Sequence, residues 1–176
     1  MTYILTKDLP DVESHIHEKR RSENWQAYQN RLQKIKKRMP LSVQEYALAD
    51  WHYNFSDHRC PHDAWLEHLI VRELVSGERS EIRSLEIEVK LLGAYHDGYI
   101  EFHYKEVKSY CFDQPHRQGK WETTKKRHKD WIVDEVDLSG NGYILHEIEW
   151  LDGGHWFIEC RSFEYNWIPI DKFLSS

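Results

Sequence analysis

The sequence predicts an α+β fold, in which N-terminal helices pack on an antiparallel β-meander of about six strands. Two observations predict it. Apolar residues recur at helical spacing up to Pro40, whereas after Ala64 they alternate with polar residues, as in a sheet with one wet face. Turn signals containing Gly then recur at short intervals. We expect residues 1–56 to form a mainly helical layer and residues 57–176 the sheet, within one domain spanning 1–176.

The first helix is indicated by one apolar stripe. Its members step by three or four residues, which places them on one side of a helix, and Pro40 then ends the helix; they are Trp25, Tyr28, Leu32, Ile35 and Met39. A second helix is predicted from Ser42 to about Ala49. Ser42 and Glu45 have the spacing of a capping box, in which each side chain satisfies a free backbone N–H of the first turn.

The strands are indicated by alternation and by turns. Segment 64–75 fits a helix or a strand, but the "SGERS" turn after it favours a hairpin with the alternating "LEIEVKL". Further hairpin turns are predicted at 95–99, 139–143 and 151–155. The alternation changes phase near Lys105 and Glu106, which predicts a bulge or bend there.

Composition and charge restrict the class of protein. The chain has 3 Cys at wide spacings, no apolar leader and no run long enough to span a membrane, which favours a cytoplasmic protein. The net charge of -6 divides into +4 for residues 1–40 and -10 for the remainder. Residues 114–129 are polar and basic, so we expect a solvated, mobile loop. The acidic strands argue against a nucleic-acid partner, because such binders present a contiguous basic patch.

The stretch "DWHYNFSDHRCPHDAW", residues 50–65, is the densest in potential ligands. In an extended chain His58, Cys60 and His62 would leave on one face, and Asp63 or His52 would complete a four-ligand metal shell. No second ligand pair at the usual spacing lies nearby, so we expect no metal or other cofactor. The other interpretation is a connector with aromatic side chains packed beneath it and hydrogen-bonded histidines.

No catalytic constellation is predicted. His96 and Asp97 lie in a turn, where neighbouring side chains point apart, and the histidines at 103 and 146 are isolated on strands. The serines lack a base or a nucleophile elbow. The sequence therefore favours a protein that is not an enzyme.

Acidic strands at 130–164 suggest the partner. This segment holds nine acids and one Arg, and two strands joined by "SGNG" would bring several carboxylates within about 5 to 8 Å of one another. We expect a basic protein or peptide to bind there, at Asp134, Glu135, Asp137, Glu147 and Glu149. In general layout the chain looks like small bacterial immunity or antitoxin-type proteins, which are acidic domains that block a basic effector. A metal-dependent hydrolase or metal-binding module built on residues 52–63 is the alternative.

Overall fold

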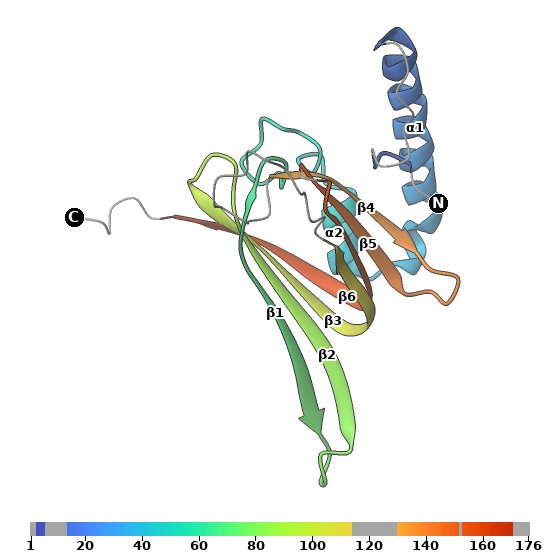
Figure 1. The fold of residues 1–176 in the computed structure, drawn as a ribbon. Helices are drawn as coiled ribbons and strands as arrows, with labels where there is room; N and C mark the ends of the chain where they lie inside the picture. Colours follow the sequence, from blue (N-terminus) through green and yellow to red (C-terminus); the bar gives the residue numbers. More distant parts are fainter. Residues whose placement is uncertain (1–2, 6–13, 114–129, 152, 171–176) are drawn as a thin grey trace, which may run out of the picture.

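The computed structural model describes residues 3–5, 14–113, 130–151 and 153–170. They form two helices, a short 3-10 turn and a six-stranded antiparallel sheet (Figure 1). The predicted α+β class is therefore confirmed. The basic segment at 114–129, for which we expect mobility, lies outside the described residues.

Helix α1 spans Ser14–Ile35, the 3-10 turn η2 spans Lys36–Arg38, and helix α2 spans Leu41–Ala47. The predicted stripe of α1 is buried from Tyr28 through Met39, and Trp25 packs partly buried against the same core. The predicted capping box is wrong. Pro40 is the N-cap of α2 and provides no side-chain hydrogen bond, whereas Ser42 lies inside the helix and its Oγ donates to the carbonyl of Phe163 at 2.7 Å.

The six strands are β1 Trp65–Ser76, β2 Ile82–Leu92, β3 Gly98–Asp113, β4 Trp131–Leu138, β5 Ile144–Trp150 and β6 His155–Pro169. The ambiguous segment at 64–75 is a strand, as predicted. Each predicted turn connects two paired strands. In the turn at 95–99 the positive φ falls on His96 at 54°, and not on Gly98. Gly98 instead leaves room for the Trp167 ring, since a Cβ there would lie 2.2 Å from it.

The strand order is β1-β2-β3-β6-β5-β4. Strands β1 to β3 and β4 to β6 are each a meander, and the two halves join where β3 pairs with β6. The predicted irregularity in β3 is present: Glu106 has φ 48° and the register with β6 shifts between Val107 and Ser109. Strand β2 pairs with β3 only from Ile87 onward, so the far part of the β1–β2 hairpin projects from the body (Figure 1).

The helices lie on one half of the molecule. Helix α2 packs on β6, and α1 lies beside the edge strand β4 (Figure 1). Residues 48–64 connect α2 to β1 by a series of turns, so the helical layer ends at Ala47. Within the described part of the chain, no helix is long and apolar enough to cross a membrane.

Candidate functional site

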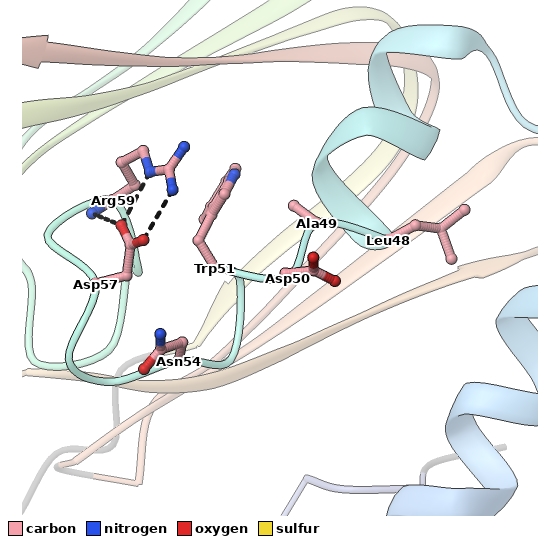
Figure 2. Close-up of a pocket in the computed structure, with 7 residues that line it drawn as sticks. All are labelled: Leu48, Ala49, Asp50, Trp51, Asn54, Asp57 and Arg59. Carbon is pink, nitrogen blue, oxygen red and sulfur yellow. Dashed lines mark hydrogen bonds and ion pairs between the residues drawn. The ribbon is translucent and has the colours of Figure 1, made fainter.

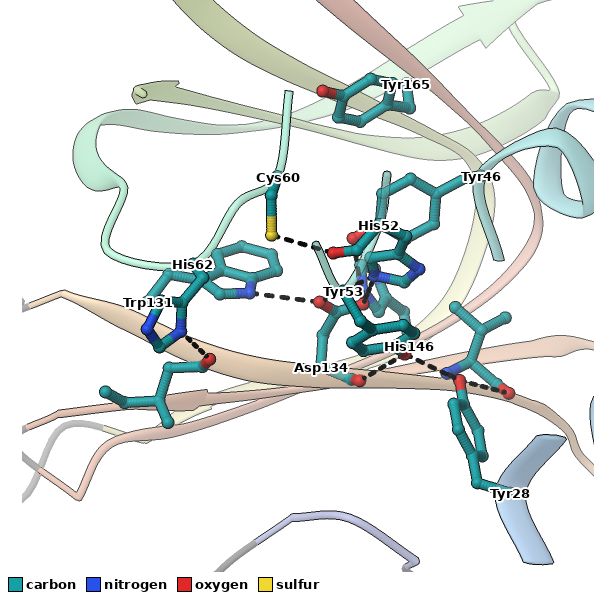
Figure 3. Close-up of polar contacts among 12 residues, drawn as sticks. Tyr28, Tyr46, His52, Tyr53, Cys60, His62, Trp131, Asp134, His146 and Tyr165 are labelled. Carbon is teal, nitrogen blue, oxygen red and sulfur yellow. Dashed lines mark hydrogen bonds and ion pairs between the residues drawn. The ribbon is translucent and has the colours of Figure 1, made fainter. Parts of the chain in front are cut away.

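The three histidine and cysteine residues of the metal-binding alternative do not converge. His58 is exposed and its Nδ1 lies 2.5 Å from a carboxylate oxygen of Asp97. Cys60 is buried and its Sγ donates to the carbonyl of His52, while His62 Nδ1 contacts the carbonyl of Ile132 at 2.7 Å (Figure 3). The chain turns at these positions instead of running extended, so the alternation that would place the three on one face is lost.

Asp63, the fourth candidate ligand, is exposed and adopts a positive φ of 61°. Its carboxylate lies 3.6 Å from His62 Nε2. Across the residues that the structure describes, no group of three or more His, Cys, Asp or Glu side chains is arranged to hold a metal ion. The geometry therefore offers no support for the metal-dependent alternative.

His52, the fifth candidate, belongs instead to a buried polar cluster centred on Asp134 (Figure 3). His52 Nε2 lies 3.0 and 3.1 Å from the two carboxylate oxygens, and His146 Nε2 lies 3.0 Å from one of them. Tyr46 and Trp131 donate to the same carboxylate at 3.0 and 3.2 Å. Four side chains from both layers thus satisfy one buried charge.

The cluster is sealed from solvent. The side chains of His52 and His146 are 0% exposed and that of Asp134 is 2% exposed. Burial raises the pKa of the Asp134 carboxyl, but the charges and hydrogen bonds of His52 and His146 outweigh it, so the pKa lies well below its ordinary value. An acid and two histidines are a common catalytic set, but these three side chains are closed to solvent. Its geometry supports a structural role, which joins the helical layer to β4 and β5.

The five carboxylates expected to bind a partner do not share one exposed face. Glu135 lies opposite Glu147 across the β4–β5 pair, whereas Asp134 points into the core. Because successive side chains of a strand point to opposite faces, the two neighbours cannot both lie on a solvent face. Asp134 is 1% exposed and Glu135 4%, so the expectation of an exposed acidic face is wrong for these two residues.

Glu135 is buried beneath the N-terminal segment. Its Oε1 accepts hydrogen bonds from the backbone N–H groups of Tyr3 at 2.7 Å, Ile4, and Leu5 at 3.0 Å. Burial raises the pKa of the Glu135 carboxyl, the three hydrogen bonds lower it, and the nearby Glu147 adds to the net rise. This carboxylate anchors the chain's own residues.

The other three carboxylates lie on strands β4 and β5. Asp137 accepts from Arg31 of α1 at 2.7 and 2.9 Å, and Glu147 lies 3.1 Å from His155 Nε2. Glu149 is half-buried and lies opposite Val133 in the ladder. The chain itself thus supplies the cationic partner of Asp137 and a histidine partner for Glu147, which weakens the case for a foreign cation at this place.

A different surface combines carboxylates with aromatic rings, and it lies around Trp51. The turns after α2 hold this indole between two hollows. The first hollow has a volume of about 460 Å³ and is bounded by Asp57 and Arg59 as well as Trp51 (Figure 2). The Arg59 guanidinium lies 5.4 Å from the centroid of the Trp51 ring and is held there by Asp57 at 2.8 and 2.9 Å. One side of the indole already carries a cation of the chain.

The second hollow, which we call the Glu45 hollow, lies between α2, Trp51 and β6. It has a volume of about 360 Å³, and the described residues of its lining provide two carboxylates and three aromatic rings but no Lys or Arg; they are Ser42, Glu45, Tyr46, Trp51, Glu164, Tyr165 and Asn166. Trp51 and Tyr165 pack with their ring centroids 4.6 Å apart. No ion pair or hydrogen bond holds the Glu45 carboxylate within the described parts of the chain. Sequence reasoning missed this site, because its residues come from three segments.

The Glu45 hollow continues into a polar groove on the outer face of the sheet. The groove has a volume of about 400 Å³, shares Glu164 and Asn166 with the hollow, and crosses β1, β2, β3 and β6. Arg72 and Glu88 of its lining contact each other, and Glu164 contacts Lys105, which lies outside the lining. Together the hollow and the groove form a surface on which an extended ligand has room.

The chain matches no family model, no curated protein and no solved structure.

Proposed function

We propose that the protein is a non-enzymatic binding module for a basic protein or peptide, and that the Glu45 hollow receives a Lys or Arg side chain of that partner. The observation that carries the proposal is the lining of the hollow, in which the described residues provide two carboxylates, three aromatic rings and no basic side chain. Carboxylates attract a cation electrostatically, and an aromatic face adds about 0.5 to 2 kcal/mol. The proposal keeps the partner expected from the sequence and moves it to a different surface.

The neighbouring hollow supports the same chemistry. There the chain's own Arg59 guanidinium lies over Trp51 and is held by Asp57. The hydrogen bonds from Arg59 lower the pKa of the Asp57 carboxyl to about 2, which keeps it charged. An acid, a guanidinium and an indole are thus stable together at this surface. The Glu45 hollow offers acids and rings around the same indole, and no Lys or Arg is among the described residues of its lining.

One lining residue of the hollow, Glu164, forms an ion pair with Lys105. The Lys105 Nζ lies 2.6 Å from Glu164, but the two side chains are 39% and 48% exposed. Exposed ion pairs contribute about 0 to 1 kcal/mol, so a partner cation can share or replace this contact at little cost. Among the described residues Glu45 has no such contact, and we take it as the main anchor for the partner cation.

The test uses a fluorescent hexalysine peptide, with a hexaglutamate peptide as the control for charge. We expect the wild-type protein to bind hexalysine at about 0.02 M salt and to lose the binding as salt rises, because exposed charges are screened. The double variant Glu45→Gln, Glu164→Gln should bind about fivefold more weakly, since each exposed ion pair contributes a fraction of a kcal/mol to about 1 kcal/mol. Fluorescence polarisation measures both.

The matched control carries Glu78→Gln together with Glu81→Gln, which removes two carboxylates at the exposed β1–β2 turn. It should bind hexalysine as the wild type does. If the control and the double variant bind alike, the attraction is only that of the net charge and the proposed site is wrong. Circular dichroism checks that each variant keeps the native fold.

A further inference from the structure

Strand β6 has a free edge beside the Glu45 hollow. It pairs with β3 as far as Pro169, but its pairing with β5 on the other side ends at Cys160. Among the strands that the structure describes, residues 161–169 therefore have a neighbour on one side only. Such an edge presents backbone groups to which another chain can add a strand.

The contacts of β6 show which backbone groups point to that edge. The carbonyl of Phe163 accepts from Ser42 of α2, so the backbone polar groups of Phe163 face away from β3. Alternate residues of a strand direct these groups to the same side, so Tyr165 and Trp167 face the free edge as well. Pro169 agrees with this assignment, since a proline lacks the N–H. Ile170, of the other parity, donates to Asp97 on the β3 side.

The edge groups of two residues are open. Within the described parts of the chain, neither the N–H nor the C=O of Tyr165 and Trp167 has a partner on the side away from β3. The side chains of Tyr165 and Trp167 are half-buried, and that of Ile168, the next residue along the strand, is 42% exposed. The Glu45 hollow lies along this edge, because its lining includes Glu164, Tyr165 and Asn166.

We infer that the basic partner binds as an additional antiparallel strand on β6, with its backbone paired to Tyr165 and Trp167. This inference rests on the proposed function and specifies the form of the ligand. Residues directly opposite one another in an antiparallel pair point to the same face. A Lys or Arg opposite Glu164 therefore shares the outer face with that carboxylate, and the residue opposite Tyr165 points toward the Trp51 side. The ligand is an extended segment with basic residues at alternate positions.

A second copy of the protein is a poorer occupant of the edge. In a symmetric dimer the two β6 strands would pair antiparallel about a two-fold axis. If that axis passes through Asn166, Glu164 of one copy lies opposite Ile168 of the other. That pairing leaves the carboxylate without a cation. A basic segment provides one, and charge complementarity therefore favours a partner chain.

The probe is the labelled peptide acetyl-Lys-Thr-Lys-Val-Lys-Thr-Lys-amide, used with the full-length protein. One N-methylated version carries the methyl groups on the central Val and the following Thr, whose N–H groups would face β6. The matched version carries them on the two central Lys residues, whose N–H groups would face away. Since the first version loses two backbone hydrogen bonds to β6, it should bind about tenfold more weakly, and the second should bind almost as well as the parent.

Hydrogen–deuterium exchange followed by NMR provides a second measurement. In the free protein the amides of Tyr165 and Trp167 should exchange faster than those of Glu164 and Asn166, which face β3. The parent peptide should slow the exchange of Tyr165 and Trp167 at least tenfold. Equal affinities for all three peptides, with no new protection, would show that only side chains bind; the inference then fails while the proposed function stands.

Two other results also overturn the inference. If no basic peptide binds, the proposed function fails with it. If the free protein forms a concentration-dependent dimer in which Tyr165 and Trp167 are already protected, the edge belongs to a second copy of the chain. Analytical ultracentrifugation across a concentration series decides this.

Discussion

At the scale of single residues, Asp134 links more of the structure than any other carboxylate described above. Its oxygens contact His52 and Tyr46 from the helical layer and its connector, and Trp131 and His146 from the sheet. A buried charge is tolerated only when it is paired and hydrogen-bonded, and this one has four partners. Removing it leaves several buried polar groups without an acceptor.

We predict that Asp134→Ala lowers the free energy of unfolding by about 3 to 5 kcal/mol at pH 7, the usual cost of breaking a buried charge pair. The folded-state pKa of Asp134 is depressed, so its contribution is complete above the unfolded pKa of about 4 and is lost as pH falls below it. The difference between wild type and variant should therefore shrink between pH 5 and pH 2. Urea unfolding at several pH values measures it, and a difference that is constant with pH would contradict the assignment. Glu78→Ala, on the exposed turn, should change stability by less than about 0.5 kcal/mol.

At the scale of elements, tyrosine hydroxyls cover the outer edge of β4, the edge strand that pairs only with β5 among the described strands. The Tyr28 OH of α1 accepts from the Val136 N–H at 2.8 Å and lies 3.4 Å from the Val136 carbonyl. The Tyr53 OH donates to the carbonyl of Asp134 at 2.9 Å. Unpaired edges promote association between chains, and these side chains occupy the groups that another strand would use. One edge is thus closed, whereas the end of β6 stays open.

Tyr28→Phe tests this closure. It removes only the hydroxyl, leaves the buried N–H of Val136 without a partner, and should cost about 1 to 3 kcal/mol. Tyr95→Phe is the control, because Tyr95 is 48% exposed and its hydroxyl contacts the carbonyl of Phe55 at the surface. Equal stabilities of the two variants in urea unfolding would show that the Tyr28 hydroxyl does not protect the edge.

At the scale of the whole molecule, the two ends of the sheet differ in support. Around β3, β5 and β6 the aromatic core is buried on the side of the helices, whereas β1 is exposed along most of its length. Several apolar side chains of the projecting hairpin are open to solvent; they are Leu74, Val75 and Ile82. A two-stranded ribbon is marginally stable by itself in water.

We therefore predict that the backbone amides of residues 72–86 exchange with solvent well before those of 87–92, which pair with β3. Hydrogen–deuterium exchange with mass spectrometry resolves the two segments. Equal protection would indicate that another surface, such as a second molecule, covers the hairpin. Repeating the measurement at tenfold dilution separates that case from intrinsic stability.

The sequence by itself determined the elements of this protein, because they depend on local periodicity. The stripe ending at Met39, the alternation in "LEIEVKL" and the Gly-containing turns each specify one element from neighbouring residues. Even the irregularity of β3 was predictable, since the change of phase near Glu106 is a local signal and a φ of 48° is found there.

Only the tertiary structure decided which side chains meet. His52, Asp134 and His146 are separated by 82 and 12 positions, and nothing in their spacing marks them as one cluster. Strand β5 is shorter than β6: it begins at Ile144, opposite Cys160, and leaves the rest of β6 without a described strand on that side, beside Glu45 and Trp51. The charges counted along the chain could not separate buried carboxylates from exposed ones. Burial depends on the face of the sheet to which each side chain points and on the layer packed against that face.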